Sequence, residues 1–334
     1  MAQHTVSIHH VHQALQGALS RGLDAEPLLL RAGIPPALLD APMARVSQAQ
    51  YGALLRVLRW RLRDEFWGLL GRPLPLGCFA HCCRLLVQTP TLGDALRTGF
   101  RYFHGEIEEF APRLCVTQGM ASIGIVPRAT DGAANEYAQR AFLFLSFGLA
   151  SWLAARRIPL AGVEYRGHAP PHGAEIDRLF QAKVAYGREH YRLWFDARWL
   201  LLPQVQNAQS LREFLEQAPA NLLVKYRDRN SATDRIRRLL RSRLHDELPS
   251  LEAVARTLAM TPHTLSRRLR EEGHGFQTLK DNLRRDTAIE LLQRPDLTLL
   301  DVAVQLGFSE ASTFHRAFKK WTGVAPGEYR HREH

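Results

Sequence analysis

The chain contains few cysteines, and none of them forms the pattern of a disulfide framework. The four are Cys78, Cys82, Cys83 and Cys115, whereas small secreted domains carry many more at regular spacings. Cys78, His81 and Cys82 could share one helix face, which leaves a thiol- or metal-responsive sensor as an alternative hypothesis. No second Cys-x-x-Cys pair or histidine cluster completes a tetrahedral set, and free cysteines in helices are mostly small core residues. We therefore expect no metal and no cofactor.

Long apolar runs are also lacking. The most apolar segment, residues 141–153, is bracketed by Arg140, Arg156 and Arg157 and is well short of the ~20 residues needed to cross a bilayer. It predicts a buried helix. The N-terminal sequence MAQHTVSIHHVHQAL has neither the charged start nor the apolar stretch of a secretion signal. We expect a cytoplasmic protein that does not enter a membrane.

The common catalytic motifs are missing as well. The sequence has no Gly-rich phosphate loop, no Gly-x-Ser-x-Gly elbow and no His-Glu-x-x-His zinc motif. His9, His10 and His12 could suggest metal affinity, but they lie in a segment that is expected to be frayed or amphipathic. We predict no catalytic residues and no enzymatic activity.

One short unit of sequence is present twice near the C-terminus. The copies are LEAVARTLAMTPHTLSRRLR, residues 251–270, and LLDVAVQLGFSEASTFHRAFKK, residues 299–320. Apolar positions match at one constant offset through the first half, and after one extra residue Leu265 and Leu269 correspond to Phe314 and Phe318. Pairs four residues apart share a helix face, so these pairs are expected in the core.

Each copy carries signals for a short helix, a tight turn and a second helix. The expected N-caps are Ser250, Thr261 before Pro262, Thr298 in a capping box with Asp301, and Ser309. Gly307 is expected to end the first helix of the second copy. The pattern predicts two helix-turn-helix units.

The second helix of each unit has a polar and basic face opposite its apolar pair. In a major groove, Arg can bond guanine bidentately, and Ser or His can reach base edges or phosphates. A solvated face is the alternative for one basic helix, but the repetition favours double-stranded DNA as the partner. The predicted DNA-binding residues are His263, Ser266, Arg267 and Arg270 in the first unit, and Glu310, Ala311, Ser312, His315, Arg316 and Lys319 in the second.

The segment between the units, residues 276–292, has helical spacing. Its inward candidates are Leu279, Leu283, Ala288 and Leu291 or Leu292. At ~1.5 Å per residue it spans about 25 Å, enough to hold two reading helices roughly one DNA turn (~34 Å) apart. We interpret it as a spacer helix, and simultaneous reading of two grooves could require bent DNA.

The sequence VQLGFSEASTFHRAFKKWTGVAPGEYR, residues 304–330, resembles the C-terminal signature of the AraC family of bacterial transcription regulators. The signature combines a Gly-Phe turn, a Phe-x3-Phe pair, a Trp-Thr-Gly stop and a Pro-x-x-Tyr-Arg ending. The resemblance covers about the last hundred residues. It implies seven helices, two of them reading bases, and activation of transcription with RNA polymerase more often than repression.

Charge alone is a weak guide to the DNA-binding region. The whole chain has a formal charge of +11, but the segment from Ser231 to the end has about 18 basic and 14 acidic residues, a balance of only about +4. A few placed phosphate contacts matter more than this total.

The N-terminal part reads as a separate α+β domain. Helical patterns fill residues 11–32, 48–62, 77–86, 92–103 and 135–156, and strand patterns fill residues 113–117, 121–126, 162–165 and 191–195. We predict an effector-binding and dimerisation domain over residues 1–222, a linker over 223–231, and an all-α DNA-binding domain over 232–334. In the latter a long helix joins the two helix-turn-helix units.

Four stretches resemble the sensing domain of the AraC branch that includes ornithine-utilisation and virulence regulators. They are AGIPPALLD (residues 32–40), SWLAARRIPL (151–160), FDARWLLLP (195–203) and APANLLVKYR (218–227). The resemblance implies an arabinose-binding-like domain that binds a small-molecule effector and forms a homodimer.

Aromatic and ionisable residues suggest where that effector could bind. The candidates are Phe100, His104, Glu136 and Arg140, although such residues can equally be plain core. Apolar walls with a few polar groups suit an organic acid, an amine or a fatty-acid-like effector. A constitutive or architectural DNA-binding protein is the main alternative, and it would not need so large an upstream domain.

Overall fold

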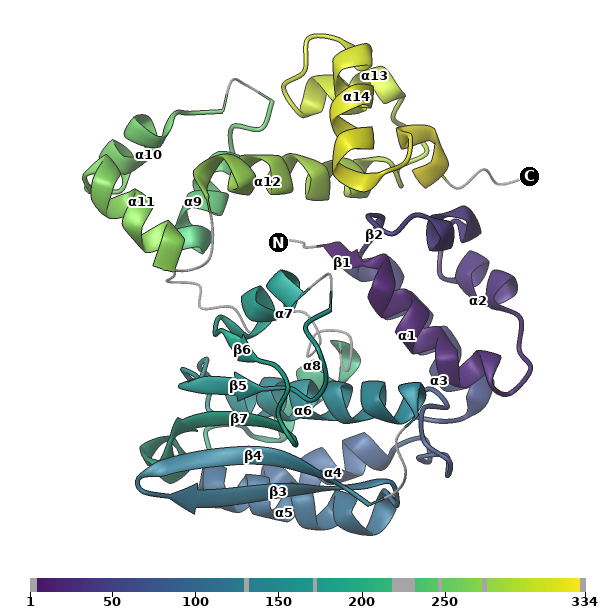
Figure 1. Ribbon diagram of the computed structural model, residues 1–334, viewed down its shortest axis with the longest axis vertical. Helices are drawn as coiled ribbons and strands as arrows, with labels where there is room; N and C mark the ends of the chain where they lie inside the picture. Colours follow the sequence, from purple (N-terminus) through teal and green to yellow (C-terminus); the bar gives the residue numbers. More distant parts are fainter. Residues whose placement is uncertain are drawn as a thin grey trace. The chain divides into compact units, whose positions relative to one another are not determined.

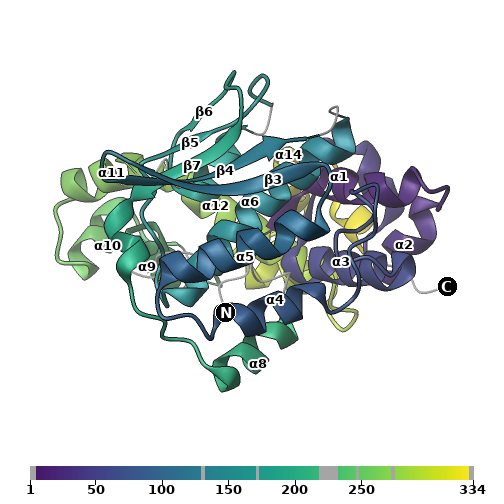
Figure 2. The ribbon, with the colours of Figure 1, turned by 90° about the horizontal axis from the view of Figure 1, so that it is seen from below.

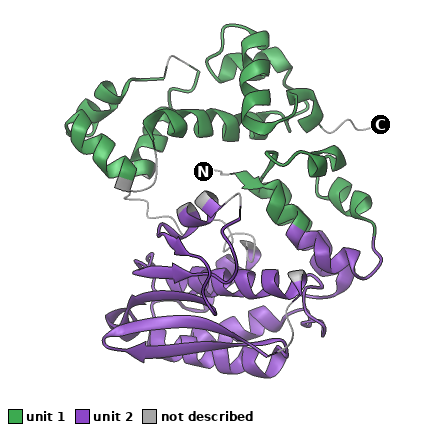
Figure 3. Cartoon of the chain, viewed as in Figure 1, with its two compact units in different colours: residues 1–12, 24–54, 228–334 green, residues 13–23, 55–227 purple. Residues whose placement is uncertain are grey.

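The computed structural model describes residues 5–128, 132–170, 173–217, 232–245, 248–271 and 275–330. The chain divides into two compact units (Figure 3). Unit 1 comprises residues 1–12, 24–54 and 228–334, and unit 2 comprises residues 13–23 and 55–227. The first 54 residues thus contribute to both units, which the sequence does not predict. The predicted linker, 223–231, and the stretch 218–227 lie outside the described residues.

Unit 2 is built around a five-stranded sheet with the order β3-β4-β7-β5-β6. The strands are β3 (Phe110–Thr117), β4 (Met120–Pro127), β5 (Gly162–Glu164), β6 (Val184–Ala185) and β7 (Tyr191–Asp196). The predicted hairpin is confirmed, with Phe110 opposite Pro127. Its two-residue turn, Gln118 and Gly119, has φ of 50° and 77°, which matches the twist of the flanking strands. The two-residue strand β6 is not foreseen in the sequence.

Helices α4 (Cys78–Leu86), α5 (Leu92–Glu106) and α6 (Ala133–Leu153) lie on one face of this sheet (Figure 2). Unit 2 also contains the shorter helices α7 (Gly173–Phe180), η2 (Ala197–Leu201) and α8 (Ala208–Gln217). The apolar segment 141–153 belongs to α6, and most of its large side chains are buried. In the described ranges no helix is both long and apolar enough to cross a membrane.

The predicted helix over residues 11–32 is wrong, because two helices occupy this range. They are α1 (Ile8–Leu19) and α2 (Ala25–Arg31). Gly22, with φ of 74°, turns the chain in a conformation that favours glycine. Asp24 then caps α2 by accepting a hydrogen bond from the N–H of Glu26 at 3.2 Å. Helix α3 (Gln48–Leu62) has the predicted bounds.

A two-stranded ribbon and a 3₁₀ turn precede α3 in unit 1. Strands β1 (Thr5–Ser7) and β2 (Arg45–Ser47) pair antiparallel, and η1 is Pro36–Asp40. Strands of three residues are too short to show an alternating pattern, so sequence periodicity misses them.

The C-terminal part of unit 1 is all helical where it is described. Its elements are α9 (Ala232–Arg241), α10 (Leu251–Thr257), α11 (Pro262–Glu271), α12 (Phe276–Leu291), α13 (Leu299–Gln305), α14 (Ala311–Thr322) and η3 (Pro326–Tyr329). Helix α12 runs between the α10–α11 pair and the α13–α14 pair (Figure 1). The α+β and all-α classes predicted for the two parts of the chain are confirmed.

The predicted packing residues of this region are buried. Leu265, Leu269, Phe314 and Phe318 are each at most 1% exposed. The inward face of α12 is Leu279, Leu283 and Ala288, followed by Leu292 rather than Leu291. One end of α12 completes a core with α9, α10 and α11, and the salt bridge from Arg241 to Glu290, at 3.1 Å, ties α9 to α12.

Candidate functional site

The two helix-turn-helix units have the same backbone geometry at their turns. Ala259 and Gly307 occupy matched positions, and both are left-handed, with φ of 53° and 74°. The closing hydrogen bonds also match, and are Met260 N to Ala255 O (2.9 Å) and Phe308 N to Ala303 O (3.0 Å). Each first helix therefore ends in the same six-to-one motif, so the sequence duplication is a structural one.

Side-chain caps begin three of the four helices as predicted. The hydroxyls of Ser250, Thr261 and Thr298 accept hydrogen bonds from the N–H groups of Ala253 (3.2 Å), Thr264 (3.1 Å) and Asp301 (3.1 Å). Asp301 returns the interaction by accepting from Thr298 N at 2.7 Å, which makes the capping box. These hydrogen bonds lower the pKa of Asp301.

The prediction that Ser309 caps the last helix is wrong. Glu310 holds the N-cap position of α14 and makes no side-chain cap hydrogen bond. Its carboxylate instead accepts from the hydroxyl of Ser312 at 3.0 Å. Helix α14 therefore begins one residue later than Ser309 suggests, with both polar side chains at its exposed N-terminal end.

The predicted DNA-binding residues lie on the surface of α11 and at corresponding positions of α14. His263, Arg267, Arg270, Glu310, Ser312, His315, Arg316 and Lys319 are exposed, and Ser266 and Ala311 are half-buried. In the part of the chain that the structure describes, no carboxylate lies within ion-pair distance of Arg270, Arg316 or Lys319. The apolar faces of α11 and α14 pack into the core, and their opposite faces carry exposed cations. This arrangement suits contact with a polyanion.

A polar cluster that the sequence does not reveal links the β1–β2 ribbon to α12 and η3 within unit 1. The Thr5 hydroxyl donates a hydrogen bond to Asp286 Oδ1 at 2.6 Å, and Arg285 donates one to the same oxygen at 2.8 Å. Arg45 donates from its backbone N–H to the Tyr329 hydroxyl at 2.9 Å and from Nε to Thr5 at 2.7 Å. Asp286 is only 5% exposed, so these partners stabilise a carboxylate inside the unit.

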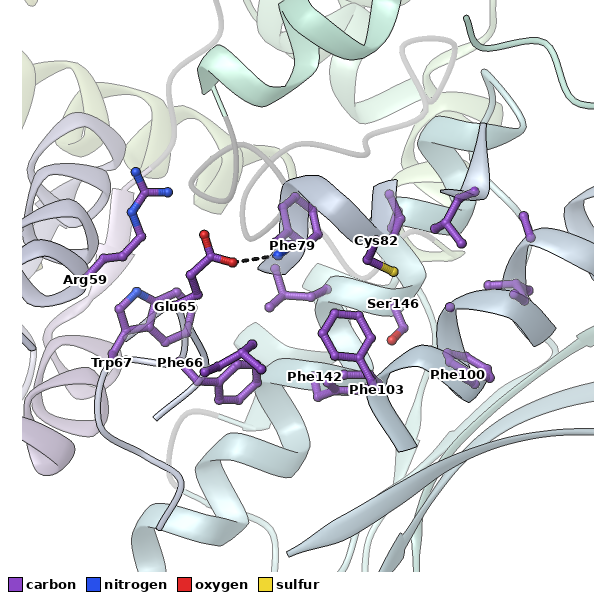
Figure 4. A pocket seen from close by; sticks show the side chains of 17 residues that line it. Arg59, Glu65, Phe66, Trp67, Phe79, Cys82, Phe100, Phe103, Phe142 and Ser146 are labelled. Atoms are coloured by element: carbon purple, nitrogen blue, oxygen red, sulfur yellow. Dashed lines mark hydrogen bonds between the residues drawn. The ribbon is translucent and has the colours of Figure 1, made fainter. Parts of the chain in front are cut away.

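Unit 2 contains a hollow of about 780 Å³, counting the part that opens to solvent (Figure 4). It lies among the end of α3, the loop after α3, and helices α4, α5 and α6. We name it the α3–α6 pocket. Most of its 17 lining residues are apolar, which is typical of small-molecule sites.

Of the four candidate effector residues, only Phe100 lines the α3–α6 pocket. His104 is exposed on α5, where its ring nitrogen meets Arg128, and desolvation and then this cation lower the pKa of His104. Glu136 is half-buried in the first turn of α6. The guanidinium carbon of Arg140 lies 5.9 Å from the ring centre of Tyr137.

The cysteines of α4 are packed as core residues. Burial raises the pKa of Cys82 to about 12, and it also raises the pKa of Cys83 and of Cys78. The Cys78 sulfur lies 3.3 Å from the Tyr102 hydroxyl. A reactive thiol needs a lowered pKa, so these three are poor candidates for a redox sensor. The described ranges contain no group of three or more side chains arranged to hold a metal ion.

Comparison with known domain families matches both parts of the chain. The arabinose-binding domain of AraC transcription regulators matches residues 22–204, more than half of the sequence, and a helix-turn-helix domain matches residues 254–332. The chain belongs to the AraC family of transcription regulators. Its domains and relatives are regulators rather than enzymes.

Several relatives are similar over nearly the whole length of this chain. The ornithine utilization regulator of Pseudomonas aeruginosa is 25% identical and covers 97% of this chain and 96% of its own. An uncharacterized HTH-type transcriptional regulator of Mycobacterium bovis is 32% identical, covering 94% of this chain and 93% of its own. The crystal structure of the regulator CdpR from P. aeruginosa is 20% identical, covers 96% of this chain and 97% of that one, and aligns with a TM-score of 0.31.

Proposed function

We propose that this AraC-family regulator binds promoter DNA through α11 and α14 and activates transcription in response to a small organic effector held in unit 2. The observation that carries the proposal is that both helix-turn-helix units have the same turn geometry. In both units the second helix, α11 or α14, also has basic side chains at matched positions. The polar faces of α11 and α14 are both small. Together they would give one chain two adjacent contacts with the grooves of DNA.

The supporting spacer is α12. Its 16 residues at ~1.5 Å each extend about 24 Å, which suits reading helices that enter successive stretches of one DNA face. The two faces carry different side chains, so the proposed site on DNA is asymmetric within each subunit. As an activator the protein would contact RNA polymerase, and it would act as a homodimer in the cytoplasm, where bacterial promoters are.

The proposed DNA contact is tested by fluorescence anisotropy of the full chain on its promoter and on a duplex of shuffled sequence. We expect Arg316→Ala to weaken promoter binding by about 1–3 kcal/mol and to relax the preference at one base pair. Lys320→Ala is the matched control, because Lys320 is exposed on α14 but lies outside the predicted face. Its replacement should remove little of the sequence preference.

Two results would contradict the proposal. Equal affinity of the unmodified chain for both duplexes would favour a constitutive architectural protein. An equal loss for Arg316→Ala on both duplexes would mean that Arg316 holds phosphate and reads no base.

A further inference from the structure

The α3–α6 pocket is polar at one end and aromatic at the other. Figure 4 shows Arg59, Glu65 and Trp67 on one side and Phe100, Phe103 and Phe142 on the opposite side. This division limits the shape and polarity of any molecule that could fill it. A ligand with one polar head and one apolar body fits both ends.

Two hydrogen-bond donors at the polar end find no acceptor among the described residues. They are the Nε of Arg59 and the indole Nε1 of Trp67, and both atoms are buried. Trp67 is only 1% exposed. A buried donor left unpaired typically costs about 1–3 kcal/mol, so two of them in one pocket indicate that an acceptor completes the site.

Glu65, the hydrogen-bond acceptor at the same end of the pocket, is already engaged by backbone N–H groups. Both oxygens of Glu65 accept backbone hydrogen bonds at the start of α4, from Gly77 N at 2.8 Å and Phe79 N at 2.6 Å. The partial positive charge of the helix N-terminus offsets this carboxylate. Arg59 has no carboxylate within ion-pair distance among the described residues, so the site attracts an anion rather than an amine.

The wall that carries Trp67 is held in place independently of any ligand. Buried Asp64 accepts hydrogen bonds from the N–H groups of Phe66 (2.8 Å), Gly68 (2.8 Å) and Leu74 (2.9 Å). Three such bonds to one carboxylate fix the loop after α3. The Trp67 donor is therefore positioned before binding, which lowers the entropic cost of recognition.

Aromatic rings form the apolar end. The Phe142 ring centre lies 5.3 Å from that of Phe103, 6.4 Å from Phe66 and 6.5 Å from Phe100. Cys82 adds a neutral wall, and Ser146 is the one hydroxyl group among the residues that line the pocket. These rings favour an alkyl or aryl body over a sugar, whose hydroxyls would remain unpaired.

We propose that the α3–α6 pocket binds a monocarboxylate with an apolar body, its carboxylate held by Arg59 and Trp67 and its body against the ring of Phe142. The role of this ligand as the effector rests on the proposed function. Its binding does not, because it follows from the pocket alone.

The test is isothermal titration calorimetry of the full chain with four eight-carbon probes: octanoate, octanamide, octan-1-ol and octylamine. We expect octanoate to bind most tightly, octanamide and octan-1-ol more weakly, and octylamine least. Octylamine binding as well as octanoate, or no binding of octanoate at millimolar concentration, would overturn the proposal.

Variants locate the site. Arg59→Gln should weaken octanoate binding about tenfold to a hundredfold, the range for loss of a charge-assisted hydrogen bond. It should weaken octan-1-ol binding much less, because that probe carries no charge. Trp67→Phe keeps a ring but removes the donor, and should weaken octanoate severalfold. Arg56→Gln is the control, since Arg56 is exposed on the same helix. Octan-1-ol binding shows that each variant is folded, and equal octanoate affinity in Arg59→Gln and Arg56→Gln would refute the proposed contact.

Promoter affinity measured with and without octanoate separates the two proposals. Arg59-dependent binding of octanoate that leaves promoter affinity unchanged supports the pocket and contradicts effector control through it. Promoter binding that responds to another compound while octanoate does not bind refutes the pocket and keeps effector control.

Discussion

In the duplicated units, the roles of some single residues can be predicted from their neighbours in the sequence. Serine and threonine caps and apolar pairs four residues apart are predictable, because neighbouring residues decide them. Ser309 is wrongly predicted as a cap because Glu310, also able to hold the position, follows it directly. The pocket donors Arg59 and Trp67 have no such signal. They line the α3–α6 pocket together with Phe142, which lies far along the chain, and sequence spacing does not predict that grouping.

The matched turn residues give a prediction at this scale. Ala259 is left-handed at the position where Gly307 stands in the other unit, and a Cβ in this conformation costs roughly 1–2 kcal/mol. Ala259→Gly should therefore raise the free energy of unfolding by about 0.5–1 kcal/mol, and Gly307→Ala should lower it by about 1 kcal/mol.

Urea unfolding of the two variants, followed by circular dichroism, measures both changes. Opposite signs are required. A loss of stability in Ala259→Gly would show that the backbone at this turn is not left-handed in solution.

At the scale of helices, the two first helices of the units differ in how they begin. Helix α13 has a reciprocal capping box, whereas the Ser250 hydroxyl caps α10 by accepting a hydrogen bond from Ala253 N. Thr298→Ala removes both hydrogen bonds of the Thr298 hydroxyl, the one it accepts from Asp301 N and the one it donates to Asp301 Oδ2. It keeps the bond from the Thr298 backbone N–H to Asp301 and should lower the free energy of unfolding by about 1 kcal/mol. Ser250→Ala is the matched comparison, and we expect a smaller loss from it in the same urea experiment.

The same capping box gives a pH dependence. The hydrogen bonds from Thr298 hold the pKa of Asp301 below its usual range, so Asp301 binds a proton less readily in the folded chain than in the unfolded one. Its contribution to stability is therefore full above the usual Asp pKa, about 4, and is lost as the pH falls through the lowered folded value.

Asp301→Asn should accordingly flatten the fall in stability below about pH 4, as measured by thermal unfolding across a pH series. An unchanged slope would mean that Asp301 is not hydrogen-bonded as the structure describes. Asp296→Asn serves as a comparison. Asp296 lies outside the capping box, and its pKa is likewise lowered by a hydrogen bond, from Arg294.

The β1–β2 ribbon is the element that sequence reasoning misses most completely. Its strands have three residues each, and its contacts to Asp286 join residues 281 positions apart. Thr5→Val removes the hydroxyl that donates to Asp286 at 2.6 Å, and should cost about 1 kcal/mol locally.

Hydrogen exchange measures that loss directly. Exchange of the amides in residues 5–7 and 45–47 should accelerate in Thr5→Val, because the ribbon opens more often. Ser7→Ala, on the same strand, is the control, since the Ser7 hydroxyl accepts a local hydrogen bond from the His9 N–H at 3.3 Å. Equal acceleration in both variants would contradict a specific contribution from the Thr5 hydroxyl.

At the scale of the whole molecule, the sequence predicts the two fold classes but not how the N-terminal residues divide. Hydrophobic periodicity and the C-terminal signature identify the helical region, and the hairpin pattern identifies the sheet. A linear reading assigns all of the first 54 residues to one domain. In the structure, residues 24–54 group with 228–334, while residues 13–23 group with 55–227. Hydrogen bonds such as the one from Arg45 N to the Tyr329 hydroxyl join residues that are far apart in the sequence.

The central claim is that one chain makes two separate base-reading contacts, one through α11 and one through α14. The direct test is the affinity of the unmodified chain, Arg267→Ala and Arg316→Ala for a complete set of single base-pair substitutions across the promoter site. We predict that each variant loses preference in a different stretch, with the two stretches roughly 10 base pairs apart. Loss of preference at the same positions in both variants, or no change in Arg267→Ala, would contradict two reading helices.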